Sequence, residues 1–328
     1  MSIVKGKIVG LYDSCQLISN GYWLKDEQGH YKIADSKYAF FSRIAFTRRF
    51  IRAEITSFYH LMNGDKIAVA KKGLFLQKNG TKIYEKCFAM PRGSKPLNLC
   101  FASSGNIYFG EYFQNMEKQA VNIYCSEDNA LTWHIAYTFA TGNINHIHGL
   151  FFDRYTNRIW VATGDRENEC IIGYTEDEFK TFIEVFRGGQ EYRTCQLFFY
   201  KDFIVFGTDT QYEQNVIKMF DRKTLEMAEL QKVQGSVIKG GQVGDVAFIS
   251  TTVEPSKVNT DRYAHLWVTK DGLHWEERYK AKKDWLPYIF QFGTFEFPQY
   301  YGIEKLERLY FSGRALKGLD GNTTYIDL

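Results

Sequence analysis

The sequence of 328 residues is poor in several features that mark particular protein classes, beginning with proline, of which it has only 5. It has no apolar run long enough to span a membrane, and its N-terminus, MSIVKGKIVGLYDS, lacks the apolar core and cleavage site of a signal peptide. No basic block marks a nucleic-acid groove, because the 41 basic and 38 acidic residues are spread evenly. We therefore expect no membrane span, no nucleic-acid partner and a cytoplasmic location, although a protein released without a signal peptide would look the same.

Motifs for common cofactors and nucleophiles are also missing. The sequence contains no glycine-rich phosphate loop, no dinucleotide fingerprint and no G-x-S-x-G elbow. Its 6 cysteines show no C-x-x-C spacing, and most of them lie in strand-like apolar segments. Cysteines placed in this way are typical of free buried thiols rather than of a disulfide framework.

The sequence is instead rich in aromatic residues, at 17%, and in glycine, with 27, a mixture typical of short strands joined by turns. The stretch from Asn145 to Asp165 shows the pattern most clearly, with two apolar strands around a polar turn. His146 and His148 stand two apart in the first strand, so their side chains leave the same face. Asp165 ends the second strand, and an antiparallel return brings it beside the start of the first. We therefore expect these three side chains at one edge of the sheet.

The strand-turn-strand unit recurs along the chain, at residues 97–112 and 196–209 and in copies that end near residues 70, 254 and 314. Hairpins with Asp and Gly turns separate the copies, and the pattern repeats about every 45–50 residues with about four strands each. This period is the signature of propeller blades. We predict an all-β protein: a single β-propeller domain over residues 1–328, with about seven four-stranded blades, or six if the two chain ends share one.

Two of these hairpins carry a recognisable motif. Residues 126–133 (SEDNALTW) and 269–275 (TKDGLHW) resemble the Asp-box (BNR repeat) of sialidase-like β-propellers, with Ala130 in place of the usual glycine. A third hairpin, at Asp177, lacks both the glycine and the tryptophan, and residues 41–45 (FSRIA) are a partial echo of the F/Y-R-I-P motif of sialidases. The resemblance implies a propeller in which the Asp-box is a structural turn on the outer strands, away from the active site.

The topology of a propeller decides where polar residues can gather. The innermost strand of each blade lines the central channel, and the second strand returns to the face where the first began. The starts of all first strands and the ends of all second strands therefore meet at one mouth. The predicted catalytic residues at this mouth are His146, His148, Asp165, Glu111, Asp209 and Glu254, and the predicted substrate-binding residues are Tyr112, Arg166, Arg193, Glu213, Gln214, Asn215, Lys239 and Arg314.

The acids of this set favour glycoside hydrolysis, which needs one protonated carboxylic acid and one carboxylate across a sugar. Glu111, Asp165, Asp209 and Glu254 could supply such a pair. An acid directly after a strand is, however, often only a turn residue. We nonetheless expect a carbohydrate-active propeller whose first candidate activity is the hydrolytic cleavage of a glycan.

Two alternatives stay open. Polysaccharide elimination needs a base and cations that neutralise a uronate carboxylate, which His146 or His148 with Tyr112, Arg193 and Lys239 would fit. The His-x-His pair with Asp165 or Glu111 could also bind a divalent metal such as zinc or manganese. Alternatively, the propeller has no chemistry and its mouth binds a glycan or a protein partner.

Overall fold

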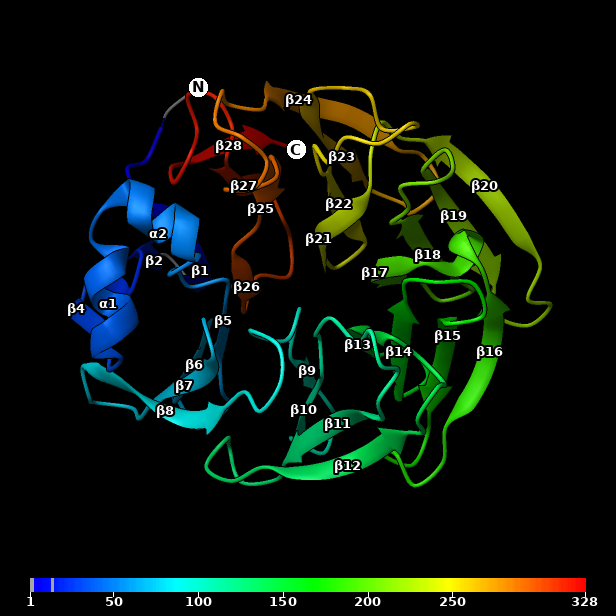
Figure 1. Cartoon of the computed structure of the whole chain (residues 1–328), viewed down its shortest axis with the longest axis horizontal. Helices are drawn as coiled ribbons and strands as arrows, with labels where there is room; N and C mark the ends of the chain where they lie inside the picture. The colour runs from blue at the N-terminus through cyan, green and yellow to red at the C-terminus, as the bar shows by residue number, and fades with distance from the viewer. Residues whose placement is uncertain (1–2, 13–14) are drawn as a thin grey trace.

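The strands form seven antiparallel groups around a central channel (Figure 1) in the computed structural model, which describes residues 3–12 and 15–328. The expected propeller is confirmed, with seven blades among the described residues. Short β-branched and aromatic segments separated by turns explain why each group forms a compact, twisted sheet. The first three blades consist of β1 (Lys7–Tyr12), β2 (Cys15–Asn20), β3 (Trp23–Asp26) and β4 (Gly29–Ile33); β5 (Ser57–His60), β6 (Lys66–Ala70), β7 (Gly73–Gln77) and β8 (Ile83–Ala89); and β9 (Cys100–Phe101), β10 (Ile107–Gly110), β11 (Val121–Ser126) and β12 (His134–Phe139).

The next blades repeat this order from the channel outward. The fourth and fifth are β13 (His146–Asp153), β14 (Arg158–Gly164), β15 (Cys170–Thr175) and β16 (Ile183–Gly188), then β17 (Thr194–Phe199), β18 (Phe203–Thr208), β19 (Val216–Asp221) and β20 (Met227–Lys232). The sixth is β21 (Val237–Val243), β22 (Val246–Thr251), β23 (Tyr263–Thr269) and β24 (Glu276–Lys282), and the last contains β25 (Thr294–Glu296), β27 (Arg308–Arg314) and β28 (Thr323–Asp327). Strand β26 (Gln299–Tyr301) runs parallel to β1 and links the last blade to the first.

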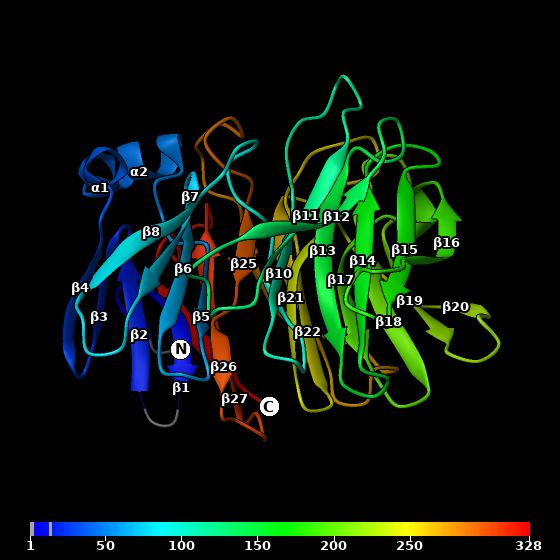
Figure 2. The same ribbon diagram turned by 90° about the horizontal axis from the view of Figure 1, so that it is seen from below.

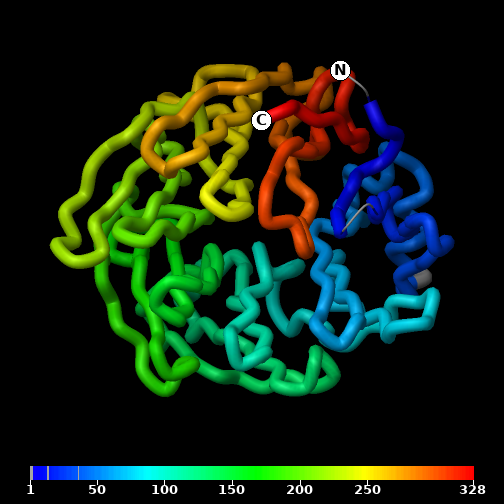
Figure 3. The backbone as a smooth tube through the Cα atoms, turned by 180° about the vertical axis from the view of Figure 1, so that it is seen from behind, coloured from blue at the N-terminus to red at the C-terminus, as the bar shows by residue number. Residues whose placement is uncertain are grey.

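The beginning of the chain completes the last blade. Val4 pairs antiparallel with Thr323 of β28, and the amide of Ile8 donates to the Thr323 hydroxyl at 2.9 Å. Figure 3 shows the two ends of the chain side by side at this blade. The possibility that both chain ends share a blade is therefore confirmed, and the count is seven because β1 to β4 form a further blade of their own.

The hydrophobic core lies between neighbouring blades rather than at the centre of the ring. One cluster joins Tyr108 and Ile123 of the third blade to Leu150 and Val161 of the fourth. Such inter-blade clusters fix the angle between adjacent sheets and leave the channel to polar and aromatic side chains. All six cysteines are free thiols, as expected.

The motif-bearing hairpins lie on the outer strands. In the turn between β11 and β12, Asp128 accepts the backbone N–H of Thr132 at 2.8 Å and its hydroxyl at 2.6 Å. Ala130 adopts a positive φ of 68°, which explains why glycine is usual at that position. The turn at Asp177 forms the same bonds with Thr181, at 2.9 and 2.8 Å, although the glycine and tryptophan are absent. These hairpins are structural elements far from the channel.

Two short helices were not expected from the sequence. Helices α1 (Ser36–Ser42) and α2 (Ala45–Ile51) connect β4 to β5 and lie at the end of the molecule where the innermost strands begin (Figure 2). Asp35 caps α1 by accepting the N–H of Tyr38 at 3.1 Å. The stretch 41–45, which echoes a sialidase motif, forms the junction between these helices rather than a strand. No helix in the described ranges is long and apolar enough to cross a membrane.

Candidate functional site

The central feature of the mouth is a cluster on the fourth and fifth blades. His146 and His148 begin β13, and the pairing of β13 with β14 sets His146 opposite Gly164, directly before Asp165. Arg193 precedes β17, and Asp209 follows β18, with the N–H of Asp209 bonded to the carbonyl of Arg193 at 2.9 Å. The strand ends thus converge as the sequence predicts.

The three leading candidates touch one another. Nε2 of His146 lies 3.1 Å from Nε2 of His148. The Asp165 carboxylate contacts both rings, with Oδ1 3.0 Å from His148 Nε2 and Oδ2 3.3 Å from His146 Nε2. The imidazole of His148 packs on Gly164, where a Cβ atom would meet its ring at 2.4 Å. Glycine is therefore required at the end of β14 for this approach.

The outer nitrogen of each histidine faces the backbone. Nδ1 of His146 is 3.0 Å from the carbonyl oxygen of Phe113, and Nδ1 of His148 is 3.0 Å from that of Thr194. Because a carbonyl oxygen only accepts, we assign the hydrogen of each neutral ring to Nδ1. Each Nε2 then presents a lone pair, so the three inner atoms require a proton or a cation among them.

Arg193 joins the cluster to a second carboxylate. Its Nη2 atom lies 2.8 Å from Asp165 Oδ1 and 3.6 Å from Asp209 Oδ2, so one guanidinium group bridges the two carboxylates. Burial opposes the ionisation of Asp165, but hydrogen bonding to His146 and His148 holds the pKa of Asp165 well below its usual range. Asp165 is a permanently ionised carboxylate at the most exposed point of the cluster, with 31% of its side chain exposed.

Glu254 behaves in the opposite way. Burial, followed by the negative charge of Asp209, raises the pKa of Glu254 to about 7, and Arg193 offsets only part of this. One oxygen of Glu254 accepts from Nε2 of Gln211 at 2.6 Å. The mouth therefore contains one carboxyl group that is about half protonated near neutral pH and another that is ionised there.

Tyr112 covers the cluster from the third blade. Its ring centroid is 4.3 Å from that of His146 and 6.2 Å from that of His148. Burial raises the pKa of the Tyr112 hydroxyl, so it stays protonated. Tyr112 is a neutral aromatic wall with a hydroxyl donor.

Glu111 does not join this cluster. It is buried, ion-paired with Arg92, and accepts the N–H of Asn122 at 2.9 Å and the hydroxyl of Tyr124 at 3.4 Å. Its oxygens are thus occupied within the third blade. The ion pair of Glu111 with Arg92 could not be predicted from the sequence, because Arg92 comes from the loop before β9.

Lys239 and Arg314 belong to a separate charged group deeper in the channel. Arg314 binds Glu296 and, at 3.0 Å, Glu54, while Lys7 binds the other oxygen of Glu296. Burial lowers the pKa of Lys239, which lies close enough for Glu296 to oppose that change. These residues tie together the first, sixth and last blades around the channel.

The loop candidates divide into structural and exposed residues. Asn215 is fully buried and bonds Thr210 and Asn259, so it holds its loop rather than a ligand. Gln214 donates to two backbone carbonyls, whereas Glu213 and Arg166 are exposed at the rim.

Four contacting residues escaped the sequence reasoning. Asn145 Nδ2 lies 3.2 Å from both Asp165 Oδ2 and His146 Nδ1, and Gln190 donates to the carbonyl of Asp165 at 2.8 Å from the 3₁₀ turn η1 (Gln190–Tyr192). The Cys195 thiol donates to Asp209 Oδ2 at 3.4 Å, and Gln211 holds Glu254. Asn145 could have been found, since it directly precedes the His-x-His pair.

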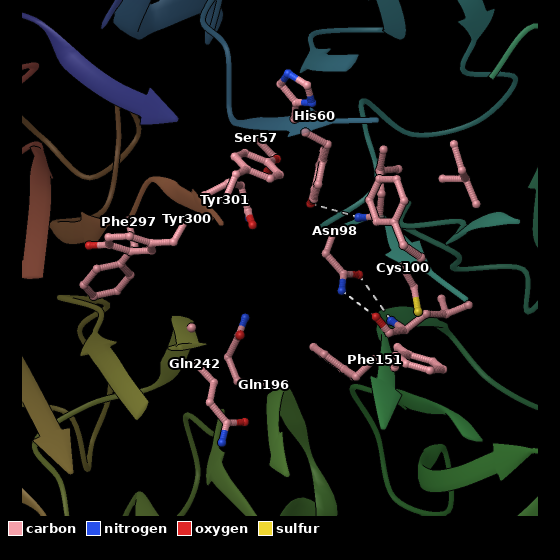
Figure 4. A pocket seen from close by; sticks show the side chains of 18 of the residues that line it. Ser57, His60, Asn98, Cys100, Phe151, Gln196, Gln242, Phe297, Tyr300 and Tyr301 are labelled. Atoms are coloured by element: carbon pink, nitrogen blue, oxygen red, sulfur yellow. Dashed lines mark hydrogen bonds between the residues drawn. The ribbon is translucent and has the colours of Figure 1, made fainter. Parts of the chain in front are cut away.

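A large cavity lies elsewhere in the channel. It measures about 760 Å³ and is lined by the far ends of the innermost strands, where His60, Met62 and Phe152 mark the face opposite to the mouth. The close-up in Figure 4 shows its aromatic wall of Tyr300, Tyr301 and Phe297. Neither histidine of the cluster nor Asp165 lines it.

Amide side chains in this cavity are committed to the backbone. Asn98 accepts from the N–H of Leu150 at 3.2 Å and donates to its carbonyl at 2.6 Å, and Gln242 makes the same pair of bonds with Phe199, at 2.8 and 2.9 Å. These bonds connect the innermost strands of neighbouring blades. The cavity consequently offers aromatic surface but few free groups for chemistry.

Two sets at the mouth could hold a metal ion by the proximity of their ligand atoms. In one, His146, His148 and Asp165 have ligand atoms within 4.8 Å of one another; in the other, His148, Cys195 and Asp209 do. The second set includes a thiol whose pKa burial raises well above its usual value, which disfavours the thiolate that a metal needs. The first set is the better candidate.

Comparison with known proteins shows the fold. No protein-family model and no curated protein matches the sequence. Among solved structures, the chain is similar to one from the crystal structure of the mitotic checkpoint complex (TM-score 0.59, 9% identity, covering 99% of this chain and 94% of that one). It is also similar to an oligogalacturonate lyase in complex with manganese (0.56, 8%, 88% and 81%) and to a prolyl endopeptidase (0.55, 9%, 94% and 46%). These proteins differ in activity, so the similarity is one of propeller architecture.

Proposed function

We propose that the protein is a glycoside hydrolase that cleaves a glycan at the mouth formed by the fourth, fifth and sixth blades. The observation that carries this proposal is the pKa of Glu254, which burial and the negative charge of the neighbouring Asp209 raise to about 7. Carboxyl groups whose surroundings push their pKa values apart are the usual sign of an acid and a base.

In this mechanism Glu254 is the general acid. It gives its proton to the glycosidic oxygen as the bond to the leaving sugar breaks, and a second carboxylate activates water or attacks the sugar carbon. Asp209 is our choice for the second group, because its charge acts on Glu254 and Asp165 is occupied by two histidines. Arg193, whose Nη2 atom lies 3.6 Å from Asp209 Oδ2 and 2.8 Å from Asp165 Oδ1, holds the two carboxylates in place.

The rim would supply the sugar contacts. Tyr112 offers a partly exposed aromatic face, which suits stacking on a sugar ring, and Arg166 and Glu213 are exposed on the loops around it. An exposed arginine beside the mouth favours a glycan that carries acid groups.

Polysaccharide elimination is the second candidate, and the similarity in fold to an oligogalacturonate lyase keeps it open. It would need a histidine base, yet all four ring nitrogens of His146 and His148 have close partners, and none of these is an arginine or a lysine. A propeller that only binds a glycan is the third candidate, supported by the ion pairs of Arg193 and by the aromatic cavity.

The deciding experiment incubates the purified protein with a panel of neutral and acidic polysaccharides, with and without added zinc or manganese. New reducing ends without the ultraviolet absorbance of an unsaturated product support hydrolysis. Both signals together indicate elimination, and neither signal with measurable glycan binding indicates a binding protein.

Variants then test the assignment. Glu254→Gln and Asp209→Asn should each lower the turnover rate about 100- to 10,000-fold, while Glu85→Gln, an exposed acid on β8, should leave it unchanged. Full activity in folded Glu254→Gln protein would refute the role of Glu254.

A further inference from the structure

The inward-facing ring nitrogens of His146 and His148, together with the Asp165 carboxylate, are the least explained feature of the mouth. His146 and His148 turn their Nε2 atoms toward each other and toward the Asp165 carboxylate, and both rings are buried, with 5% and 1% exposed. With the hydrogen of each neutral ring on Nδ1, these acceptors repel one another in a mostly buried site. A positive charge at their centre turns this repulsion into attraction.

We propose that His146, His148 and Asp165 bind a single divalent transition-metal ion, and that zinc is the preferred one. The distances fit. Zinc bonds to histidine nitrogen and carboxylate oxygen are about 2.0–2.2 Å long, so tetrahedral ligand atoms lie about 3.3 Å apart. Nε2 of His146 and Nε2 of His148 are 3.1 Å apart, and Asp165 turns one oxygen toward each ring, with Oδ1 3.0 Å from His148 Nε2 and Oδ2 3.3 Å from His146 Nε2. One ligand atom from each of the three residues lies within 4.8 Å of the other two.

The surroundings of the ligands support the same assignment. Histidines that bind metal usually donate their other N–H to a carbonyl or carboxylate, which fixes the ring and its tautomer. Both rings do so here, toward Phe113 and Thr194 at 3.0 Å. The carboxylate is likewise held, by Arg193 at 2.8 Å and by Asn145 at 3.2 Å.

The ligand set also indicates which metal binds and what the site leaves free. Two imidazole nitrogens and one carboxylate oxygen are borderline donors, for which affinity rises from manganese through cobalt to zinc. Three protein ligands leave the fourth tetrahedral position open, as in catalytic zinc sites. Because Asp165 is the partly exposed member, that position faces the mouth, where a water molecule or an oxygen of the substrate would bind.

The proposal concerns binding and is independent of the reaction proposed above. The test strips the whole protein with a chelator and titrates it with zinc, cobalt and manganese by calorimetry, with the visible spectrum of cobalt as a second signal. We expect one ion per chain and the affinity order zinc, cobalt, manganese. No saturable binding by the folded wild-type chain would overturn the proposal and leave a shared proton as the positive charge in the cluster.

Three variants locate the site. His148→Ala and Asp165→Asn should each weaken zinc binding by about 10- to 100-fold or more, whereas His274→Ala, in the exposed turn between β23 and β24, should bind as the wild type does. Asp165→Asn keeps the side-chain volume, so it tests the ligand role even if His148→Ala fails to fold. Unchanged zinc affinity in folded Asp165→Asn protein would show that the ion binds elsewhere.

Discussion

Replacing Glu254 should stabilise the protein while it removes the proposed acid, because a carboxyl group with a raised pKa is a burden on the folded state. The pKa of Glu254 is raised from an ordinary value of 4.5 to about 7. A tenfold change in an equilibrium constant corresponds to about 1.4 kcal/mol, so ionised Glu254 costs the folded state at most about 3.5 kcal/mol. Since Glu254 is only partly buried, we expect about 1–2 kcal/mol after screening by water.

The sign of the effect follows from proton binding. Below about pH 4.5 both the folded and the unfolded chain hold the proton, and the cost is absent. Between about pH 4.5 and about pH 7 the unfolded chain releases the proton and the folded chain keeps it, so the free energy of unfolding falls as pH rises. Above pH 7 the cost is constant. Glu254→Gln removes it, so the advantage of the variant should grow over this window and then level off.

The assay is urea unfolding followed by tryptophan fluorescence, from about pH 4 to about pH 9, with a chelator present. The chelator matters because a bound dication would lower the pKa of nearby carboxyl groups. Glu85→Gln, on an exposed outer strand, is the control and should show no such pH-dependent gain. An advantage of Glu254→Gln that is the same at every pH, or a loss of stability at high pH, would refute the reasoning.

Three further changes separate chemistry from structure. His148→Ala should lower the free energy of unfolding, because it removes a buried ring and leaves the Thr194 carbonyl without its donor, while the folded fraction keeps the hydrolytic activity assigned to Glu254 and Asp209; loss of that specific activity would contradict the assignment. Trp133→Ala should cost about 2–4 kcal/mol by loss of packing against Phe88 and leave the folded fraction fully active, as a thermal melt and a rate per folded molecule would show. Asp153→Ala should cost about 3–5 kcal/mol because it strands the Arg222 guanidinium, 2.5 Å away, in a buried site, and an unchanged melting temperature would argue against that pair.

The sequence was sufficient for the features that depend on local pairing. The two strands around residues 154–157 fold back with His146 opposite Gly164, so the predicted meeting of the histidines with Asp165 needed only an antiparallel register. The repeat likewise predicted the propeller, because every blade except the last is built from neighbouring segments.

Features that depend on distant residues could not be predicted. Glu111 and Asp165 both follow second strands. Glu111 is nevertheless ion-paired with Arg92 from another loop, whereas Asp165 contacts two histidines. Lys239 and Arg314 were expected beside Asp165 but gather around Glu296, whose place in the ring depends on the pairing of the last blade with the first. Helices α1 and α2 were missed because their aromatic residues also suit strands, and the capping residue Asp35 was the available signal.

The joining of Val4 to Thr323 has a mechanical consequence. The chain runs continuously from blade to blade except at this seam, where Val4 pairs with Thr323 and β26 pairs with β1 beside it. A load applied between residues 4 and 323 would shear those few hydrogen bonds before it reached any other blade. Pulling at these two points should therefore release the last blade as a separate, low-force step. A covalent link between residues 4 and 323 should close the ring and remove that step.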